Sequence, residues 1–478
     1  MQKNRIVFTL LVAIFLAGCQ TGDNIASVNY AYVDIFLTDV ADKNITIVFT
    51  NERDTDVSLP PVIVDTTLKN EVYPPEEHVD TFNYIPNEIR NFEPPELIEQ
   101  SGDFDPSQQS LYKEWLVGDR YNWNVHSDFA AGGGTSRAAT LEKQLTVWGR
   151  TINIWVEDGE FESGKIDAAE LEYIASYVGN IYASVVDIAK EPWGTHSASN
   201  LIPSDQPLDI VLMNFNKDTR PYGTIGYFWS RDNYRKSTYK DSNEAVVILV
   251  DTETYYLGTK QYVLSTIAHE LTHAINFYQR YVLMGSEHQF ATFLNEMTAV
   301  MMEDVVAKQI SHNSVSSEYT NWLRAPLYHC DFAKWGACGD SYSVAGSFGA
   351  FLLRQYGIDF YKALLGMGGS SLDVLHKALS PYNNEGLGLA LRNWGASIAM
   401  FPSSDAPEGF GYPARSDNGV ELEAFDGNVY KQYRNLPDSS PSVLEAHAHF
   451  PFLRRTTDYI YEETFLVPEG VSVSVVVQ

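Results

Sequence analysis

One short stretch near the middle of the chain, His269-Glu270-Leu271-Thr272-His273, has residue types and spacing that suit metal binding and proton transfer. Residues 260–280 contain no Pro or Gly, and their apolar residues recur at helical spacing, which predicts a helix. The imidazoles of His269 and His273 then lie on one helix face and point toward one metal ion. Glu270 is rotated by about 100° from His269, which suits a carboxylate that takes a proton from water beside the metal. Alternatively, both histidines are ordinary core residues with satisfied ring nitrogens.

A second helix is predicted over residues 290–310, and it carries Glu296 in an otherwise apolar segment. A carboxylate on an apolar helix face is unfavourable unless it is paired or bound to a metal. Glu296 is therefore the predicted third ligand. Two histidines and one glutamate leave the fourth position of a tetrahedral zinc open for water, as in catalytic sites. His288, in the loop between the helices, is an alternative ligand, although a histidine exposed on a loop is the simpler interpretation.

These motifs resemble those of the gluzincin zinc metallopeptidases, the thermolysin-like clan, and more closely those of the hyicolysin family. The resemblance implies an α+β fold, in which a mixed sheet packs over a helical lobe with two metal-bearing helices and is flanked by small β elements. It also implies one catalytic zinc ion, with Glu270 as the general base and a protein or peptide as the substrate. The segments that carry it are 226-GYFWSRD-232, 242-SNEAVVILVD-251, 265-STIAHELTH-273 and 294-LNEMTA-299.

Two further residues are candidates for supporting roles. In related peptidases a tyrosine at the start of a helix donates its hydroxyl to the tetrahedral intermediate, and Tyr342 falls in that position. A helix-start aromatic residue without a chemical role is the alternative. A metal-bound histidine usually donates its other ring N–H to a carboxylate or carbonyl. Glu303 lies two helical turns after Glu296 on the same face and is predicted to orient a histidine. Asp304 is the second choice, and a solvated acidic pair is the plain interpretation.

The N-terminus reads as a lipoprotein signal. Residues 1–18 begin with basic residues, continue with an apolar run too short to span a membrane, and end in small residues before Cys19. Leu16-Ala17-Gly18-Cys19 resembles a bacterial lipobox, which implies lipid on Cys19 and an exported, membrane-anchored protein, at the outer membrane, in the periplasm or on the surface of a bacterium. The alternative is an ordinary secretory signal with an incidental cysteine.

The chain is strongly acidic, with 33 Lys and Arg against 62 Asp and Glu. Removing the signal takes away Lys3 and Arg5 and leaves 31 basic against 62 acidic residues. Such a charge argues against nucleic acid as a partner. A calcium site is an open alternative without a location, because the acidic stretch 157-EDGEFESGKID-167 lacks calcium-loop spacing. In an oxidising compartment, Cys330 and Cys338 are predicted to form a disulfide.

The chain divides into four predicted regions. They are a signal (1–18), a tether with a small β element and a Pro-rich linker (19–141), a zinc metallopeptidase domain (142–404) and a C-terminal β element (405–478). Within the peptidase domain we expect one strand over residues 145–157 and a helix that begins after Asp167. In gluzincins the substrate pairs with an exposed edge strand, and 246-VVILVD-251 is expected to be that edge or its neighbour. Tyr227-Phe228-Trp229 is expected to line the cleft, with plain core packing as the alternative.

The predicted function is that of a lipid-anchored, exported zinc endopeptidase. One rival is a surface binding or adhesion lipoprotein that keeps the peptidase fold without activity; the complete histidine and glutamate set argues against it. The other rival is a zinc aminopeptidase, which needs an acidic segment that binds the free amine of the substrate. Glu244 is the only acid close before residue 245, so endopeptidase activity is favoured.

Overall fold

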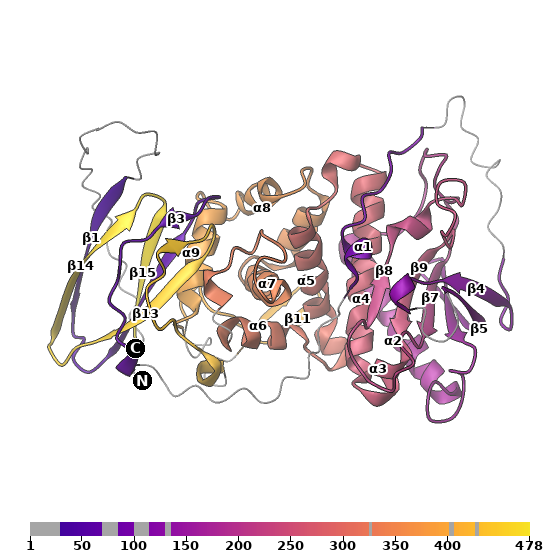
Figure 1. Cartoon of the computed structure of the whole chain (residues 1–478), viewed down its shortest axis with the longest axis horizontal. Helices are drawn as coiled ribbons and strands as arrows, with labels where there is room; N and C mark the ends of the chain where they lie inside the picture. Colours follow the sequence, from indigo (N-terminus) through magenta and orange to yellow (C-terminus); the bar gives the residue numbers. More distant parts are fainter. Residues whose placement is uncertain are drawn as a thin grey trace. The chain divides into compact units, whose positions relative to one another are not determined.

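The chain folds into two compact units, each built from segments that are distant in the sequence (Figure 1). Unit 1 comprises Met1–Pro74, Val315–Phe360 and Leu375–Gln478, and unit 2 comprises Pro75–Ser314 and Tyr361–Val374. The predicted boundaries at residues 142 and 404 stay a prediction, and the two units cut across them. The computed structural model describes residues 29–68, 85–99, 114–129, 135–324, 327–400, 406–425 and 430–478.

Unit 2 contains a mixed six-stranded sheet in the order β4-β5-β6-β7-β9-β8. Strands β6, β7 and β9 are parallel, and the remaining pairs are antiparallel. The central strands β7 and β9 are fully buried apolar runs, as expected for parallel strands covered on both faces. Residues 246–251 were expected to form the edge strand or its neighbour. They form β9, which is the neighbour of the short edge strand β8. The strands are β4 (Arg120–Asn124), β5 (Ser136–Val147), β6 (Arg150–Glu157), β7 (Leu208–Met213), β8 (Gly226–Phe228) and β9 (Val246–Asp251).

The strand expected over residues 145–157 is in fact a hairpin. The chain reverses at Trp148 and Gly149, both with positive φ (48° and 85°), so that Val147 pairs with Arg150. Positive φ at both central residues is typical of the tight two-residue turns that match strand twist. The single-strand prediction was wrong because tryptophan is not a turn residue, and only Gly149 marked the break.

Helices cover one face of this sheet. Helix α4 packs against β8, β9, α2 and α5, while a core containing Trp123, Trp155 and Leu249 covers the opposite face. Asp167 caps α2 as predicted, because its carboxylate accepts hydrogen bonds from the backbone of Ala169 and Glu170. The helices are α1 (Asn87–Arg90), α2 (Ala168–Ala189), α3 (Thr252–Leu257), α4 (Lys260–Asn276) with a π-helical continuation (Phe277–Val282), and α5 (Thr292–Ile310).

Unit 1 joins the two ends of the described chain in one β core. Strand β1 pairs with β14, and β2 lies between β13 and β15, so the two β elements expected at opposite ends pack together. The strands are β1 (Tyr30–Thr38), β2 (Asn44–Asn51), β3 (Val57–Ser58), β10 (Arg415–Asp417), β11 (Val420–Leu422), β12 (Val443–Leu444), β13 (His449–Arg455), β14 (Ile460–Pro468) and β15 (Val471–Val477). Helices α6 (Val315–Arg324) and α9 (Leu387–Ser397) belong to this unit, and α7 (Ser341–Gly366) and α8 (Leu372–Leu379) cross the division.

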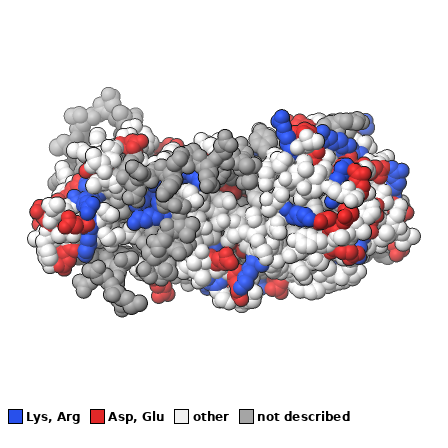
Figure 2. All heavy atoms as spheres, turned by 90° about the horizontal axis from the view of Figure 1, so that it is seen from below, with Lys and Arg blue, Asp and Glu red and all other residues white. Residues whose placement is uncertain are grey.

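The surface is charged and mixed. On the face drawn in Figure 2, acidic and basic side chains lie next to one another. Among the described residues, no helix is long and apolar enough to cross a membrane. Cys19 and the predicted signal lie outside the described residues, so the lipid anchor stays a prediction.

Candidate metal centre

Helices α4 and α5 bring three ligand atoms to one point. The Oε2 atom of Glu296 lies 3.2 Å from Nε2 of His269 and 3.4 Å from Nε2 of His273. The two imidazole rings stand nearly perpendicular, with their centroids 4.7 Å apart. His269 and His273 meet because they are four residues apart on one helix, and Glu296 joins them from the neighbouring helix. This is the convergence expected from the sequence.

These separations fit a single zinc ion. Tetrahedral ligands at metal distances of about 2.0–2.1 Å lie about 3.3 Å from one another, close to the two separations between Glu296 and the histidines. All three side chains are buried, with exposed fractions of 3 %, 8 % and 3 % for His269, His273 and Glu296. The donor set of two imidazoles and one carboxylate is one that zinc prefers.

Without a metal, the carboxylates around His269 favour its protonated form. Burial disfavours the charged form of His269, but hydrogen bonds to Glu296 and Glu303 outweigh burial and raise the pKa of His269 well above its usual value. Burial also opposes ionisation of Glu296, and the two histidines nevertheless lower the pKa of its carboxyl. The charges around His269 and Glu296 thus favour a cation between them, and a metal ion can take the place of the proton.

Glu270 is positioned beside the ligands rather than among them. Its Oε2 accepts a hydrogen bond of 2.8 Å from the backbone N–H of Phe228 on the edge strand β8. The side chain is completely buried, and burial raises the pKa of its carboxyl. A carboxylate with a raised pKa is a better proton acceptor, which suits a general base.

The orienting carboxylate predicted for a histidine is in place. Oε1 of Glu303 lies 2.7 Å from Nδ1 of His269, the ring nitrogen that faces away from Glu296. The other oxygen of Glu303 accepts hydrogen bonds from the hydroxyls of Ser265 (2.9 Å) and Ser314 (2.5 Å). This arrangement fixes the ring orientation and directs Nε2 toward Glu296, the third proposed ligand. By contrast, Nδ1 of His273 has no hydrogen-bond partner among the described residues.

A small cavity of about 80 Å³ adjoins these residues. Glu270, His273 and Glu296 contribute its polar wall, together with the amides of Asn276, Gln289 and Asn295. Its apolar wall comes from two isoleucines and four phenylalanines, namely Ile85, Ile89, Phe92, Phe228, Phe277 and Phe290. The segment Tyr227-Phe228-Trp229 thus divides between the two expected roles, because Phe228 lines the cavity while its neighbours belong to the core.

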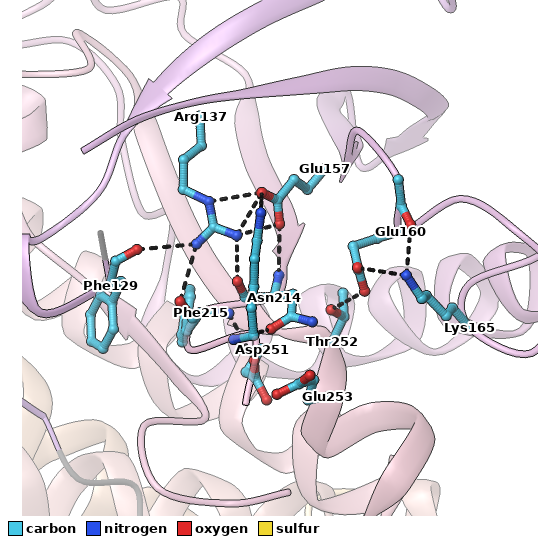
Figure 3. A network of polar contacts seen from close by, with 12 residues as sticks. Phe129, Arg137, Glu157, Glu160, Lys165, Asn214, Phe215, Asp251, Thr252 and Glu253 are labelled. Carbon is cyan, nitrogen blue, oxygen red and sulfur yellow. Dashed lines mark hydrogen bonds and ion pairs between the residues drawn. The ribbon is translucent and has the colours of Figure 1, made fainter. Parts of the chain in front are cut away.

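A buried polar network holds the loop that leads to β8 (Figure 3). Arg137 on β5 pairs with Glu157 at the end of β6, with an Nε–Oε1 distance of 2.8 Å. The backbone of Asn214 then donates to Glu157, and that of Phe215 donates to Asp251 at the end of β9. Because these carboxylates fix the start of the loop, they help set the position of the backbone N–H that reaches Glu270.

Two other candidates make contacts of their own. Tyr342 begins α7 in unit 1 and packs edge-on against Trp335, so its role as an oxyanion donor stays a prediction. Nδ1 of His288 accepts a hydrogen bond from the backbone of Gly369, and this histidine is not part of the metal cluster. Among the described residues, metal-binding side chains gather only around His269 and His273, with Glu270 and Glu296 beside them, so calcium stays without a location.

The predicted disulfide is present in unit 1. Cys330 and Cys338 are bonded, with their Cα atoms 6.0 Å apart, and close a short surface loop. The prediction from cysteine number and compartment is therefore confirmed.

Comparison with known proteins decides the family. The model of the Peptidase M30 family matches residues 133–478, which is most of the chain and includes every proposed ligand. The chain belongs to the Peptidase M30 family. A relative, the neutral metalloprotease ShpI of Staphylococcus hyicus, is 26 % identical over 246 residues. The match covers 48 % of this chain and spans about half (52 %) of that protein. These matches support the resemblance to zinc metallopeptidases.

Solved structures similar to this M30 chain are remote. An aminopeptidase N family protein from Idiomarina loihiensis has a TM-score of 0.34 at 11 % identity, over 70 % of this chain and 68 % of its own. A two-domain M1 zinc metallopeptidase bound to L-arginine has a TM-score of 0.32 at 10 % identity, over 54 % of this chain and 51 % of its own. The structure itself shows the α+β class, and a closer relation to the thermolysin-like fold stays a prediction.

Sequence reasoning missed one residue of the site. Arg90 on α1 lines the cavity, and its Nε lies 3.7 Å from Oε1 of Glu296. The prolines and acids of residues 66–115 favour a linker or an extended wrap, and nothing periodic in them pointed to the metal site. An arginine inside an acidic linker was the only signal.

Proposed function

We propose that this M30 protein is a zinc endopeptidase that hydrolyses internal bonds of proteins or peptides. The observation that carries the proposal is the convergence of His269 Nε2, His273 Nε2 and Glu296 Oε2, with Glu270 beside them. A zinc ion held there would supply Lewis acidity toward water and the peptide carbonyl. Glu270 takes the proton from the attacking water and delivers it to the leaving amine. Tyr342 is the proposed second donor to the developing oxyanion.

Endopeptidase activity fits the cavity better than aminopeptidase activity. An aminopeptidase must bind the free ammonium of its substrate, usually with an acid beyond the metal ligands and the base. Among the described residues that line the cavity, Glu270 and Glu296 are the only acids, and the remaining charged side chain is the cation Arg90. No third acid of the described lining is therefore placed to bind the ammonium group of a substrate.

A pair of substrates separates the alternatives. The zinc-loaded protein should cleave an internally quenched peptide whose two ends are blocked, and leave an aminoacyl anilide with a free amine intact. Cleavage of the anilide alone would establish the aminopeptidase. Full zinc occupancy without cleavage of either substrate would favour the silent binding protein.

The remaining parts of the proposal concern location. Anchoring by lipid on Cys19 and export to a bacterial membrane or surface rest on the signal pattern alone. Mass spectrometry of the protein purified from its native host tests them, because a diacyl or triacyl modification of an N-terminal Cys19 is expected. An N-terminus at another residue, without lipid, would contradict the anchor.

A further inference from the structure

We propose that residues 85–99, here called the cover segment, form an intramolecular cover over the candidate catalytic cavity. The cover segment must be displaced before a peptide reaches Glu270 and the metal ligands. This inference rests on the proposed function and concerns how access to the same site is controlled.

The first observation is that the reacting side chains are buried and the space beside them is small. Glu270 has no exposed surface, and the three proposed ligands are at most 8 % exposed. The adjoining cavity of about 80 Å³ has room for only a few water molecules, whereas sites for small organic ligands usually measure about 300–1,000 Å³. A peptide chain that crosses a cleft therefore needs space that is filled here.

The second observation is what fills it. The cover segment contributes four residues to the cavity wall, and three of them are large apolar side chains. Ile85 and Ile89 are 3 % and 6 % exposed, and Phe92 packs edge-on against Trp229. Arg90 points at Glu296, at 3.7 Å, and so brings a cation to the carboxylate that is the proposed metal ligand. Half of the six large apolar side chains in the cavity wall thus come from one short segment of the chain.

The third observation is how the segment is held. Near its end, Ser199 and Asn200 hydrogen-bond the backbone of Ile98 and Glu96, and tyrosine hydroxyls hold the two prolines before them. The hydroxyl of Tyr281 donates to the carbonyls of Pro94 (3.0 Å) and Pro95 (2.8 Å), and that of Tyr234 donates to Pro95 (3.0 Å). Neither proline has an N–H, so neither can donate a backbone hydrogen bond at this point. Hydrogen bonds between neutral groups contribute little net stability each, so such a contact is reversible. The cover segment also lies before residues 133–478, the part that matches the M30 family.

Removing the two tyrosine hydroxyls tests the cover without touching the catalytic residues. We would compare the zinc-loaded parent with the double variant Tyr234→Phe, Tyr281→Phe. Two rates are measured: zinc removal by dipicolinate, and kcat/KM on the blocked, internally quenched peptide. Loss of the hydroxyl bonds should increase both rates about 10-fold or more, because the displaced state becomes more populated.

A matched control is available on the same π-helical turn. The hydroxyl of Tyr278 donates to the carbonyl of Thr195, which is not part of the cover segment. Tyr278→Phe removes the same group from a similarly buried position and should leave both rates within about twofold of the parent. An equal increase in Tyr278→Phe would show general loosening and would overturn the proposal.

Arg90→Ala separates a cover from a positioning residue. If Arg90 only holds the cover segment near Glu296, the variant should release zinc faster and cleave faster, as the tyrosine variants do. If Arg90 instead orients Glu296 for catalysis, kcat should fall while the tyrosine variants stay unchanged. The second pattern contradicts the cover.

Failure of the cover differs from failure of the proposed function. If the parent binds zinc but the tyrosine variants release it no faster, the cover is wrong and the metal site stands. If no variant binds zinc after metal-replete purification, the metal site itself is wrong and the cover falls with it.

Discussion

At the scale of single residues, the site depends on which nitrogen of each histidine is available. Nδ1 of His269 contacts the carboxylate of Glu303, so Nε2 of the same ring faces Glu296. Helical spacing put Glu303 on the face of Glu296 and made it the candidate to orient a histidine, whereas the contact with His269 in particular comes from the structure. Arg90 was not predictable, because its approach to Glu296 depends on the path of a segment without periodic structure.

Loss of the Glu303 carboxylate should weaken zinc binding. Glu303→Gln removes the charge that favours a protonated Nδ1 and orients His269, and such changes typically cost about 10- to 100-fold in metal affinity. Competition with a chromogenic chelator measures the affinity. The control is Glu287→Gln, an exposed glutamate of the loop between the helices. Equal affinities for the two variants would contradict the orienting role.

At the scale of elements, the charged side chains of the unit 2 sheet lie at the ends of its parallel strands or are hydrogen-bonded inside the sheet. The helix over residues 168–189 and the strand over residues 246–251 were predictable, since caps and apolar runs are local signals. The β5–β6 hairpin was not, because a turn through Trp148 depends on how the two strands pair. Buried Asp209 on β7 was also missed, and it links two strands through Asn153 and Trp155.

Asp209 should make the stability of unit 2 depend on pH. Burial raises the pKa of its carboxyl to about 6 from the ordinary 3.8, so the folded state favours the protonated form. The favourable contribution is therefore full below about pH 4 and is lost as pH rises through 6, a change of about 3 kcal/mol at most. Asp209→Asn keeps an acceptor oxygen for both donors and removes this loss.

Urea unfolding at two pH values checks the sign. The variant should be more stable than the parent at pH 8 by on the order of 1–3 kcal/mol, and by about half as much at pH 5. A stability difference that is equal at both pH values would show that Asp209 is not the group that titrates.

At the scale of the whole molecule, the chain closes unit 1 with strands from both ends of its described part. Strand β2 pairs with β13 and β15, more than 390 residues away in sequence. Each strand was visible as a β-branched run, but nothing in a local pattern specifies a partner at such a distance. The sequence therefore predicted a β element near each end of the chain but not that the two elements pair with each other.

The disulfide should stabilise unit 1 alone. Replacing Cys330 and Cys338 by serine removes the cross-link of a short loop, which costs about 2.5 kcal/mol in the chain-entropy account. Calorimetry should show one transition shifted to lower temperature, and zinc content should not change, because the proposed ligands lie in unit 2. Loss of zinc in this variant would contradict a role of the disulfide that is confined to unit 1.

The most direct test of the central claim compares zinc content and casein hydrolysis in residues 20–478 and in their Glu270→Gln variant. One zinc per chain in both proteins is expected, because Glu270 lies beside the ligands and does not bind the metal. Hydrolysis should fall by at least about 1,000-fold in the variant, since the proton acceptor is lost. Absence of zinc from the metal-replete parent, or full activity of Glu270→Gln, would contradict the site built on His269, His273 and Glu296.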